Sequence, residues 1–283
     1  MNPTLVNSMG RTPAHFVKAD LHTHSNCSDG TLPPLELLTF LQTSGVEVAS
    51  ITDHDTLAAY ESPPVVSGIT LIPGVEFSTT VAKAGVHVVG LGVRTSCPDL
   101  LRVVAQQKRA RASRAERIAQ ALEAAGLPNL LSDACARSGN DTPGRPHFAA
   151  GVVAAGRAKD AKQAFARYLG RGKRGDVKAD WAELSTVINW IHDAGGIAVL
   201  AHPARYKLNR NKLIGLIKTF AECGGRAIEV ISGRQDPATT GQLAKFAGDF
   251  GLLSSVGSDF HSPDQVWLKP GKIEVLPPTC EPV

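Results

Sequence analysis

The chain has 283 residues, 43% of them hydrophobic, and a formal net charge of +4, which suits one large α/β domain or one domain with an insert. No apolar run approaches the ~20 residues that span a bilayer, and residues 1–17, which lack the apolar segment of a signal peptide, are interpreted as a loose leader. The five cysteines are scattered and form no CxxC pair, which argues against a disulfide framework or a thiolate zinc site and indicates a reducing cytoplasm.

Charge is unevenly distributed along the chain. Residues 101–180 carry 16 Lys and Arg against 7 Asp and Glu, whereas the remainder carries 14 against 19. A basic middle within an acidic frame suggests an anionic ligand that binds between the two. The alternative for the basic residues is a solvated helical surface.

Short apolar runs alternate with helical patterns in the first and last parts of the chain. Seven strands are predicted, at 17–21, 46–52, 69–75, 87–93, 197–201, 227–231 and 252–256. Helices are predicted between them, at 35–44, 181–194, 213–223 and 240–248. This repeated βα order predicts a mainly parallel sheet or barrel.

The middle of the chain has a different character. A long helical pattern over 100–125 is rich in Ala and Arg, and further helices and a basic turn at 170–175 follow without a strand candidate. We therefore expect residues 101–180 to form a helical basic insertion domain in a frame built from 18–100 and 181–283.

Metal-ligand residue types stand at the ends of most predicted strands. His22 and His24 are two residues apart, a spacing that places both imidazoles on one face of an extended strand. His87 stands at the opposite end of its strand and contributes only if the chain folds back. Six of the nine histidines belong to this set, which consists of Asp20, His22, His24, Asp53, His54, Glu76, His87, His202, Asp259 and His261. Because the carboxyl ends of parallel strands form one rim, we expect these side chains to meet there.

Imidazole with carboxylate and without thiolate suits Mn, Fe or Zn. The candidates outnumber the ligands of one ion, so two or three ions are implied, with Glu76 as a bridge. Such ions stabilise a phosphoryl transition state and supply hydroxide near neutral pH. Alternatives stay open for single residues: His87 as a core histidine, Asp53 as a turn cap, and Asp20 and Asp55 as turn or supporting residues.

The segments DLHTHS, SDG, ITDHDT, GVEFS, HVVGLG, AHP and GSDFH together resemble the polymerase and histidinol phosphatase (PHP) superfamily. The resemblance implies a distorted seven-stranded (β/α)7 barrel with up to three ions. It implies one ion held by His22, His24, Glu76 and Asp259, a second by Glu76, His87 and His202, and a third by Asp29, His54 and His261. Asp29 enters only through the resemblance, since its local pattern is that of a turn.

Within the superfamily, the segments TPGRPHFA, AFARYLGRGKRGDV and AHPARY resemble small bacterial enzymes that act on 3′,5′-nucleotide bisphosphates and short oligonucleotides. This implies removal of a 3′-phosphate and trimming of RNA from the 5′ end, with Mn²⁺ as the expected ion, Zn or Fe as alternatives, and Glu76, His202 and Asp259 as catalytic residues. Arginine suits a second phosphate because its planar fork matches phosphate oxygens. The candidates are Arg111, Arg114, Arg145 and Arg205, with a surface charge as the alternative for the helix arginines.

Three other functions share parts of this pattern. A histidinol-phosphate-type phosphomonoesterase would have the same metal rim, but its cationic substrate fits a basic insert poorly. A nucleic-acid-binding module with a structural metal would need a closed four-ligand site. An amidohydrolase is possible on fold grounds alone. We expect a nucleotide or short oligonucleotide as the partner in the cytoplasm, without a membrane or an obligate protein partner.

Overall fold

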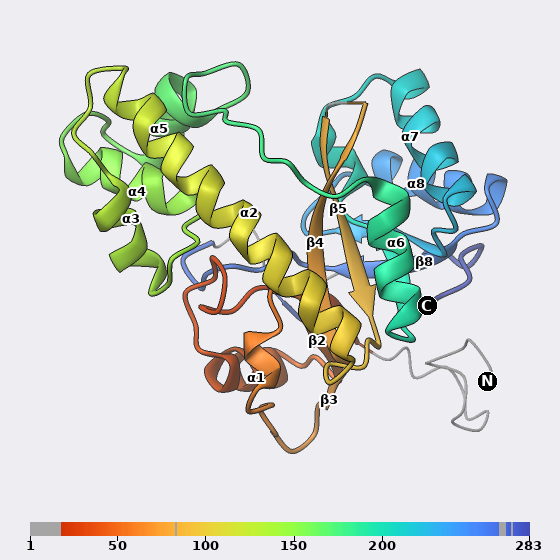
Figure 1. Ribbon diagram of the computed structural model, residues 1–283. Coiled ribbons are helices and arrows are strands. Elements are labelled where there is room, and N and C mark those ends of the chain that lie inside the picture. The colour runs from red at the N-terminus through yellow and green to blue at the C-terminus, as the bar shows by residue number, and fades with distance from the viewer. Residues whose placement is uncertain (1–17, 83, 266–269, 273) are drawn as a thin grey trace.

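The computed structural model describes residues 18–82, 84–265, 270–272 and 274–283, so the predicted leader at 1–17 lies outside the described residues (Figure 1). The described strands form two sheets. The first sheet contains, in order, β1 (Ala19–Thr23), β2 (Val48–Ile51) and β3 (Thr70–Leu71), all parallel. The second contains, in order, β4 (Gly74–Val81), β5 (Ala84–Leu91), β6 (Ile197–Leu200), β7 (Ala227–Ser232) and β8 (Leu253–Gly257).

Two isolated parallel bridges join the sheets. One links Thr23, at the end of β1, to Phe260, just after β8. The other links His54, just after β2, to Glu76 within β4. Both bridges involve or adjoin the predicted ligands, so the joins between the sheets bring the ends of β1, β2 and β8 together with β4.

Most strand pairs are parallel, as predicted, but β5 runs antiparallel to both of its neighbours, β4 and β6. The predicted strand at 69–75 is also split, because Pro73 stands between β3 and β4 and proline cannot donate a ladder hydrogen bond. Glu76 therefore lies inside β4 rather than beyond a strand end. His87 lies inside β5, which begins three residues before it.

Four helices cover the strands outside the middle of the chain: α1 (Pro34–Thr43), α6 (Leu184–Asp193), α7 (Arg210–Glu222) and α8 (Pro237–Asp249). They lie within a few residues of the predicted helices because each has a clear apolar face. Ile191 of α6, Phe220 of α7 and Phe246 of α8 are buried in one core with Phe77 of β4. Among the described residues, no helix has both the length and the apolarity needed to cross a bilayer.

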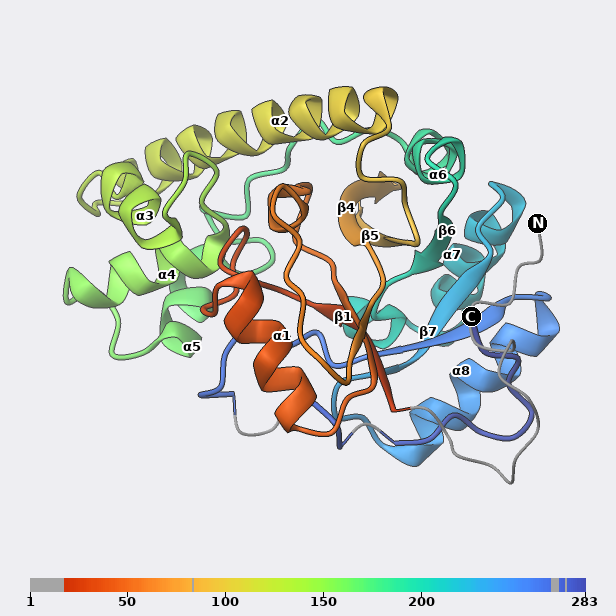
Figure 2. The same ribbon diagram turned by 90° about the horizontal axis from the view of Figure 1, so that it is seen from below.

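Residues 101–180 contain no strand and are built on α2 (Pro98–Glu123), α3 (Leu131–Ser138), α4 (Arg145–Ala154), α5 (Ala161–Ala164) and a π-helical turn, η2 (Phe165–Leu169). Leu100 and Val103 of α2 belong to the main core, whereas Ile118 and Leu122 pack with Phe148 in a separate apolar cluster. Figures 1 and 2 show α3, α4 and α5 grouped around the far half of α2, on the opposite side of the molecule from α7 and α8. A single helix thus connects two cores.

Candidate metal centre

His22 lies in β1 and His24 follows it by two residues, so the strand's alternation places both rings on one side. Both are fully buried, and their Nε2 atoms are 3.1 Å apart. Asp259 Oδ1 lies 3.1 Å from His24 Nε2 and 3.5 Å from His22 Nε2, and Glu76 Oε2 lies 3.3 Å from each. A side-chain carbon at Gly257 would collide with Cβ of His22, so only glycine allows β8 to approach β1 this closely.

Glu76 is the centre of the cluster. Its Oε1 is 2.8 Å from His87 Nδ1 and 2.9 Å from His202 Nε2, and its Oε2 is 2.8 Å from His54 Nδ1. The antiparallel register explains the place of His87: it lies opposite Ser78, and Glu76 is two residues from Ser78 on the same face of the hairpin. Residues from both sheets therefore meet at one fully buried carboxylate.

Asp29 approaches the other edge of the cluster. Its Oδ1 is 3.2 Å from His261 Nε2, 3.8 Å from His54 Nε2 and 3.9 Å from His24 Nδ1. The turn that carries Asp29 is held by Asp53, which accepts hydrogen bonds from the backbone and hydroxyl of Ser25 and from the hydroxyl of Ser28. Asp53 thus supports the turn rather than joining the cluster.

The cluster has the properties of a divalent-metal site. Four of its buried atoms make no hydrogen bond: Asp29 Oδ1, His54 Nδ1, Glu76 Oε2 and His202 Nδ1. His54 Nδ1 and Glu76 Oε2 are close enough to form one, but they do not have hydrogen-bond geometry. Buried polar atoms rarely remain unpaired, and those that do call for another partner. The ligand sets of the structure overlap, as the groups His22–His24–Asp259, His22–Glu76–His202, His54–Glu76–His87 and His24–Asp29–His54–His261 show. These four groups together contain all nine predicted ligands, and each offers ligand atoms close enough together to hold a metal ion.

The electrostatics keep the carboxyl groups ionised. Burial alone would raise the pKa of Glu76, but His54, His87 and His22 hold that pKa well below its usual range. Burial and the nearby His261 lower the pKa of His24 to about 4, so its imidazole is neutral at pH 7 and able to bind a metal. Burial opposes the charged form of His261, yet Asp29 raises its pKa to about 10. A metal ion that bound His261 would have to displace a proton.

Two supporting residues are absent from the predicted set. Glu229, fully buried in β7, receives a hydrogen bond from His22 Nδ1 at 2.5 Å and another from the backbone N–H of His202 at 2.6 Å. The Tyr206 hydroxyl accepts a hydrogen bond from the backbone N–H of His87 at 2.9 Å and donates one to the carbonyl of Ala201. The signal for Glu229 was an isolated acid in the apolar strand AIEVIS.

The other acidic candidates support the site from outside. Asp20 accepts a hydrogen bond from the backbone N–H of Ser258 at 2.8 Å. Asp55 contacts Arg111 of α2, with 2.5 Å between its Oδ2 and the arginine Nε, and accepts a hydrogen bond from Gln107 at 3.0 Å. Asp55 therefore anchors α2 next to His54.

The four predicted arginines lie at different distances from the cluster. Arg205 contacts it directly through an ion pair with Asp259. Arg111 reaches it through Asp55. The other two bond to the insert itself: Arg114 Nε donates to the carbonyl of Val177, and Arg145 to the carbonyl of Leu169 and the carboxylate of Asp176.

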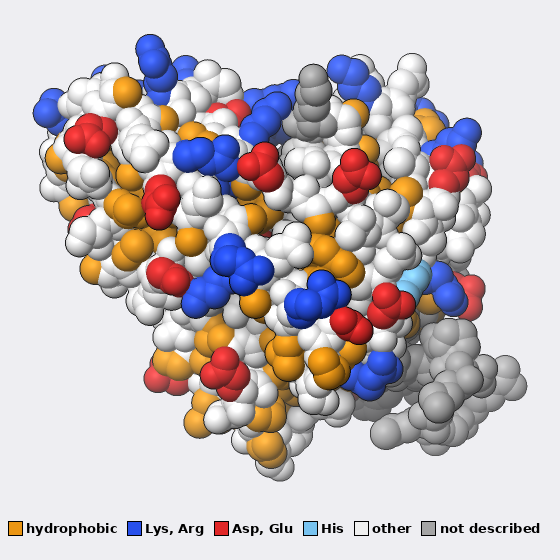
Figure 3. All heavy atoms as spheres, viewed as in Figure 1, with side chains coloured by type: hydrophobic (Ala, Val, Ile, Leu, Met, Phe, Trp, Pro, Cys, Tyr) orange, Lys and Arg blue, Asp and Glu red, His pale blue; other side chains and the backbone are white. Residues whose placement is uncertain are grey.

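The insert nevertheless borders the cluster and carries crowded positive charge. A side-chain carbon at Gly144, the residue before α4, would lie 3.8 Å from Asp29 Oδ2. Burial, with Arg145 and Arg111 nearby, lowers the pKa of Arg114 to about 9. On the face shown in Figure 3, by contrast, Lys and Arg side chains are interspersed with Asp and Glu. The partly buried arginines, rather than the overall charge, therefore distinguish this part of the insert.

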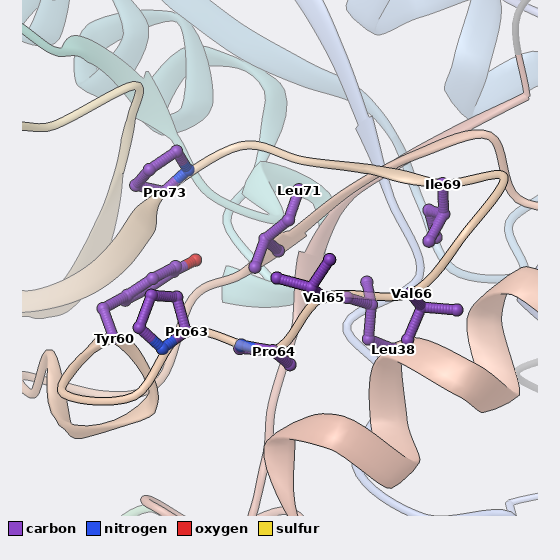
Figure 4. Close-up of a pocket in the computed structure, with 9 residues that line it drawn as sticks. All are labelled: Leu38, Tyr60, Pro63, Pro64, Val65, Val66, Ile69, Leu71 and Pro73. Atoms are coloured by element: carbon purple, nitrogen blue, oxygen red, sulfur yellow. The ribbon is translucent and has the colours of Figure 1, made fainter.

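An apolar pocket of about 260 Å³ lies away from the cluster (Figure 4). Its lining residues come from α1, from the segment between β2 and β3, from β3, and from Pro73 just after β3. Tyr60 is the one titratable residue among them. The Tyr60 hydroxyl is already bonded to the carbonyl of Ile51 and the backbone N–H of Gly74. This pocket offers no groups for metal or phosphate chemistry.

Comparison with known proteins agrees with this geometry. No protein-family model matches the chain. It is 41% identical over 258 residues to a 5′-3′ exoribonuclease of Haemophilus influenzae, covering 90% of this chain and 93% of that protein. It is 37% identical over 268 residues to a 3′,5′-nucleoside bisphosphate phosphatase of Chromobacterium violaceum, covering 93% and 94%.

Two solved structures resemble the chain over nearly its whole length. A structure described as an amidohydrolase from Chromobacterium violaceum, with bound sulfate and no metal, superposes with a TM-score of 0.86 at 36% identity and covers 94% of each chain. One described as a metal-dependent phosphoesterase from Bifidobacterium adolescentis has a TM-score of 0.76 at 27% identity and covers 93% of this chain and 92% of that one. The chain belongs to the PHP family of metal-dependent phosphoesterases, in the group that contains 5′-3′ exoribonucleases and 3′,5′-nucleoside bisphosphate phosphatases.

Proposed function

We propose that this protein is a metal-dependent phosphoesterase that removes the 3′-phosphate of 3′,5′-nucleoside bisphosphates and cleaves short oligonucleotides from the 5′ end. The names of its relatives support both activities. The observation that carries the proposal is one cluster of six imidazoles and three carboxylates, with Glu76 at its centre. One reaction covers both substrates: water adds to phosphorus, the bond from phosphorus to the 3′ oxygen breaks, and that oxygen takes a proton.

In this proposal His22, His24, Glu76 and Asp259 hold one ion, Glu76, His87 and His202 a second, and Asp29, His54 and His261 a third. The short contacts within each set support it. Bound divalent ions would activate water and neutralise the charge on the phosphoryl oxygens and the leaving 3′ oxygen. Imidazole and carboxylate ligands suit Mn²⁺, which we propose over Zn or Fe.

Glu76, His202 and Asp259 are the proposed catalytic residues, since each would touch an ion next to the reacting phosphate. Glu76 reaches two ligand sets through its two oxygens. Arg205 pairs with Asp259, so its guanidinium can contact a phosphate and hold this carboxylate in place at once.

Arg111, Arg114 and Arg145 are proposed to bind the 5′-phosphate, the group that is not hydrolysed. A terminal phosphate is close to a dianion at pH 7, and crowded guanidinium groups suit it. Burial lowers the pKa of Arg114, and repulsion from Arg145 and Arg111 lowers it further. A bound anion would relieve that repulsion.

We further propose that residues 101–180 act as a substrate-binding insert in a barrel formed by 18–100 and 181–283. Its separate apolar cluster supports this division. The two bridges between the sheets support a closed ring of seven strands, β1, β2 and β4 to β8, with β3 as a side strand. The five free cysteines support a cytoplasmic location.

A phosphate-release screen tests the proposal. Purified protein with Mn²⁺ is assayed on adenosine 3′,5′-bisphosphate, adenosine 5′-monophosphate, histidinol phosphate and a 5′-phosphorylated trinucleotide, with the 5′-nucleotide product quantified by chromatography. We expect phosphate from the bisphosphate and 5′-nucleotide from the trinucleotide. Preference for histidinol phosphate would favour the monoesterase alternative, and RNA binding without any hydrolysis would favour a binding module.

A further inference from the structure

A pocket of about 550 Å³ opens beside the cluster, a volume within the range of ~300–1,000 Å³ that suits a ligand as large as a nucleotide. Asp29, Asp259 and His261 of the cluster line it, together with Arg205 and Arg234. Arg234 belongs to neither the predicted ligands nor the predicted substrate arginines. It lies in the connection between β7 and α8.

The backbone around Arg234 is fixed on both sides. The N–H of Gly233, which has a positive φ of 60°, donates to the carbonyl of Gly257, two residues before Asp259. On the other side, the Gln235 side chain donates to the carbonyl of Val230 at 2.6 Å and to the hydroxyl of Thr240 at 2.8 Å. The loop therefore holds Arg234 at a defined position next to Asp259.

The Arg234 side chain itself is exposed, and no hydrogen bond or ion pair joins it to another described residue. Arg111, Arg145 and Arg205, in contrast, are each paired with a carboxylate. A guanidinium on a fixed backbone, facing a pocket without a protein partner, is available for an anionic ligand.

The number of arginines differs between the insert and the β7–α8 connection. The insert arginines present several charges close together, which suits a terminal phosphate monoester. Arg234 presents one free guanidinium, which suits the single charge of a phosphodiester. Pro146 of α4 in the insert and Arg234 of the β7–α8 connection line the same pocket, so one substrate can contact both the insert and Arg234.

We propose that Arg234 binds the first phosphodiester on the 3′ side of the scissile phosphate and thereby selects oligonucleotides over mononucleotides. This inference rests on the proposed function. In a 5′-phosphorylated trinucleotide, the scissile phosphate lies at the ions, and the next phosphodiester is one nucleotide away in the pocket. Adenosine 3′,5′-bisphosphate has no such group.

The test is the ratio of kcat/KM for the trinucleotide pApApA to kcat/KM for adenosine 3′,5′-bisphosphate. Loss of a charged hydrogen bond worth ~1.5–3 kcal/mol corresponds to a decrease of roughly ten-fold or more, which we expect in the ratio for Arg234→Ala. Arg234→Lys should restore part of it. In Arg234→Ala, the slope of log kcat/KM for the trinucleotide against log salt concentration should also become shallower by about one. That change corresponds to one fewer counterion released on binding.

Arg226→Ala is the matched control, because Arg226 is also exposed and stands just before the start of β7, at the other end from Arg234. It should leave the ratio unchanged. An unchanged ratio in Arg234→Ala would overturn the inference, as would an equal loss on both substrates. A wild-type protein inactive on both substrates would instead refute the proposed function, so the two failures are distinguishable.

Discussion

Glu229 Oε1 lies 2.5 Å from Nδ1 of His22, and its second oxygen accepts a hydrogen bond from the backbone of His202. The Glu229 carboxylate, in the middle of β7, thus positions His22 of one proposed ion site and His202 of another. A carboxylate behind a ligating imidazole fixes the tautomer and the orientation of the ring, and leaves Nε2 free for a metal. His22 Nε2 does face the cluster, 3.3 Å from Glu76 Oε2.

Glu229→Gln should weaken Mn²⁺ binding by roughly ten- to a hundred-fold, because the amide cannot provide the negative charge that holds the His22 ring. Calorimetric titration of chelator-treated protein measures this affinity. Glu222→Gln, an exposed change in α7, serves as the control. Equal affinities in Glu229→Gln and wild type would show that Glu229 has no part in positioning His22.

The sequence indicated which side chains gather in the cluster but not the residues that support them. His22, His24, His54, Asp259 and His261 stand at or beyond strand ends, where a local pattern identifies them. Glu229 and Tyr206 act through tertiary contacts between strands far apart in the chain. No local pattern shows which strand will lie behind a given histidine.

The direction of one strand, β5, was missed. Alternation and turn residues look alike in parallel and antiparallel strands, so the pattern around His87 did not reveal that β5 is antiparallel. This direction places His87 beside Glu76 within one hairpin. In α2 the helical pattern was clear, but the division of its apolar residues between two cores depends on the packing of the whole chain.

Glu76→Ala and Asp259→Ala should each abolish phosphate release while the helical circular dichroism of the whole protein is retained. Glu76 provides oxygens to several ligand sets, and Asp259 lies against both His22 and His24. The apolar cluster of the insert contains neither residue. Retention of full activity in either variant would contradict the proposed metal cluster, and metal content measured on the same samples should fall with activity.

Asp55→Asn should destabilise the protein by about 3–5 kcal/mol, because it leaves the largely buried guanidinium of Arg111 without its carboxylate. Urea denaturation gives the free energy of unfolding. Asp99→Asn removes an exposed ion pair with Arg102 at the N-terminal end of the same helix and should have a much smaller effect. Similar losses in the two variants would show that the Asp55 contact does not anchor α2.

Asp20 should make the stability of the chelator-treated protein depend on pH. The carboxyl is fully buried, and its Oδ2 has no hydrogen-bond partner. Burial raises its pKa from 3.8 to about 6, so the folded state binds a proton more tightly than the unfolded state. The contribution of Asp20 to the free energy of unfolding is therefore favourable at pH 4 and is lost as pH rises through 6.

Asp20→Asn removes this titration and keeps an oxygen for the N–H of Ser258. Relative to wild type, the variant should gain up to about 3 kcal/mol in unfolding free energy between pH 4 and pH 7.5. Asp249→Asn, at an exposed ion pair of α8, should show no such gain. Urea denaturation at a series of pH values in chelator measures the difference, and a difference that stays constant from pH 4 to pH 7.5 would show that Asp20 titrates alike in the folded and unfolded chains.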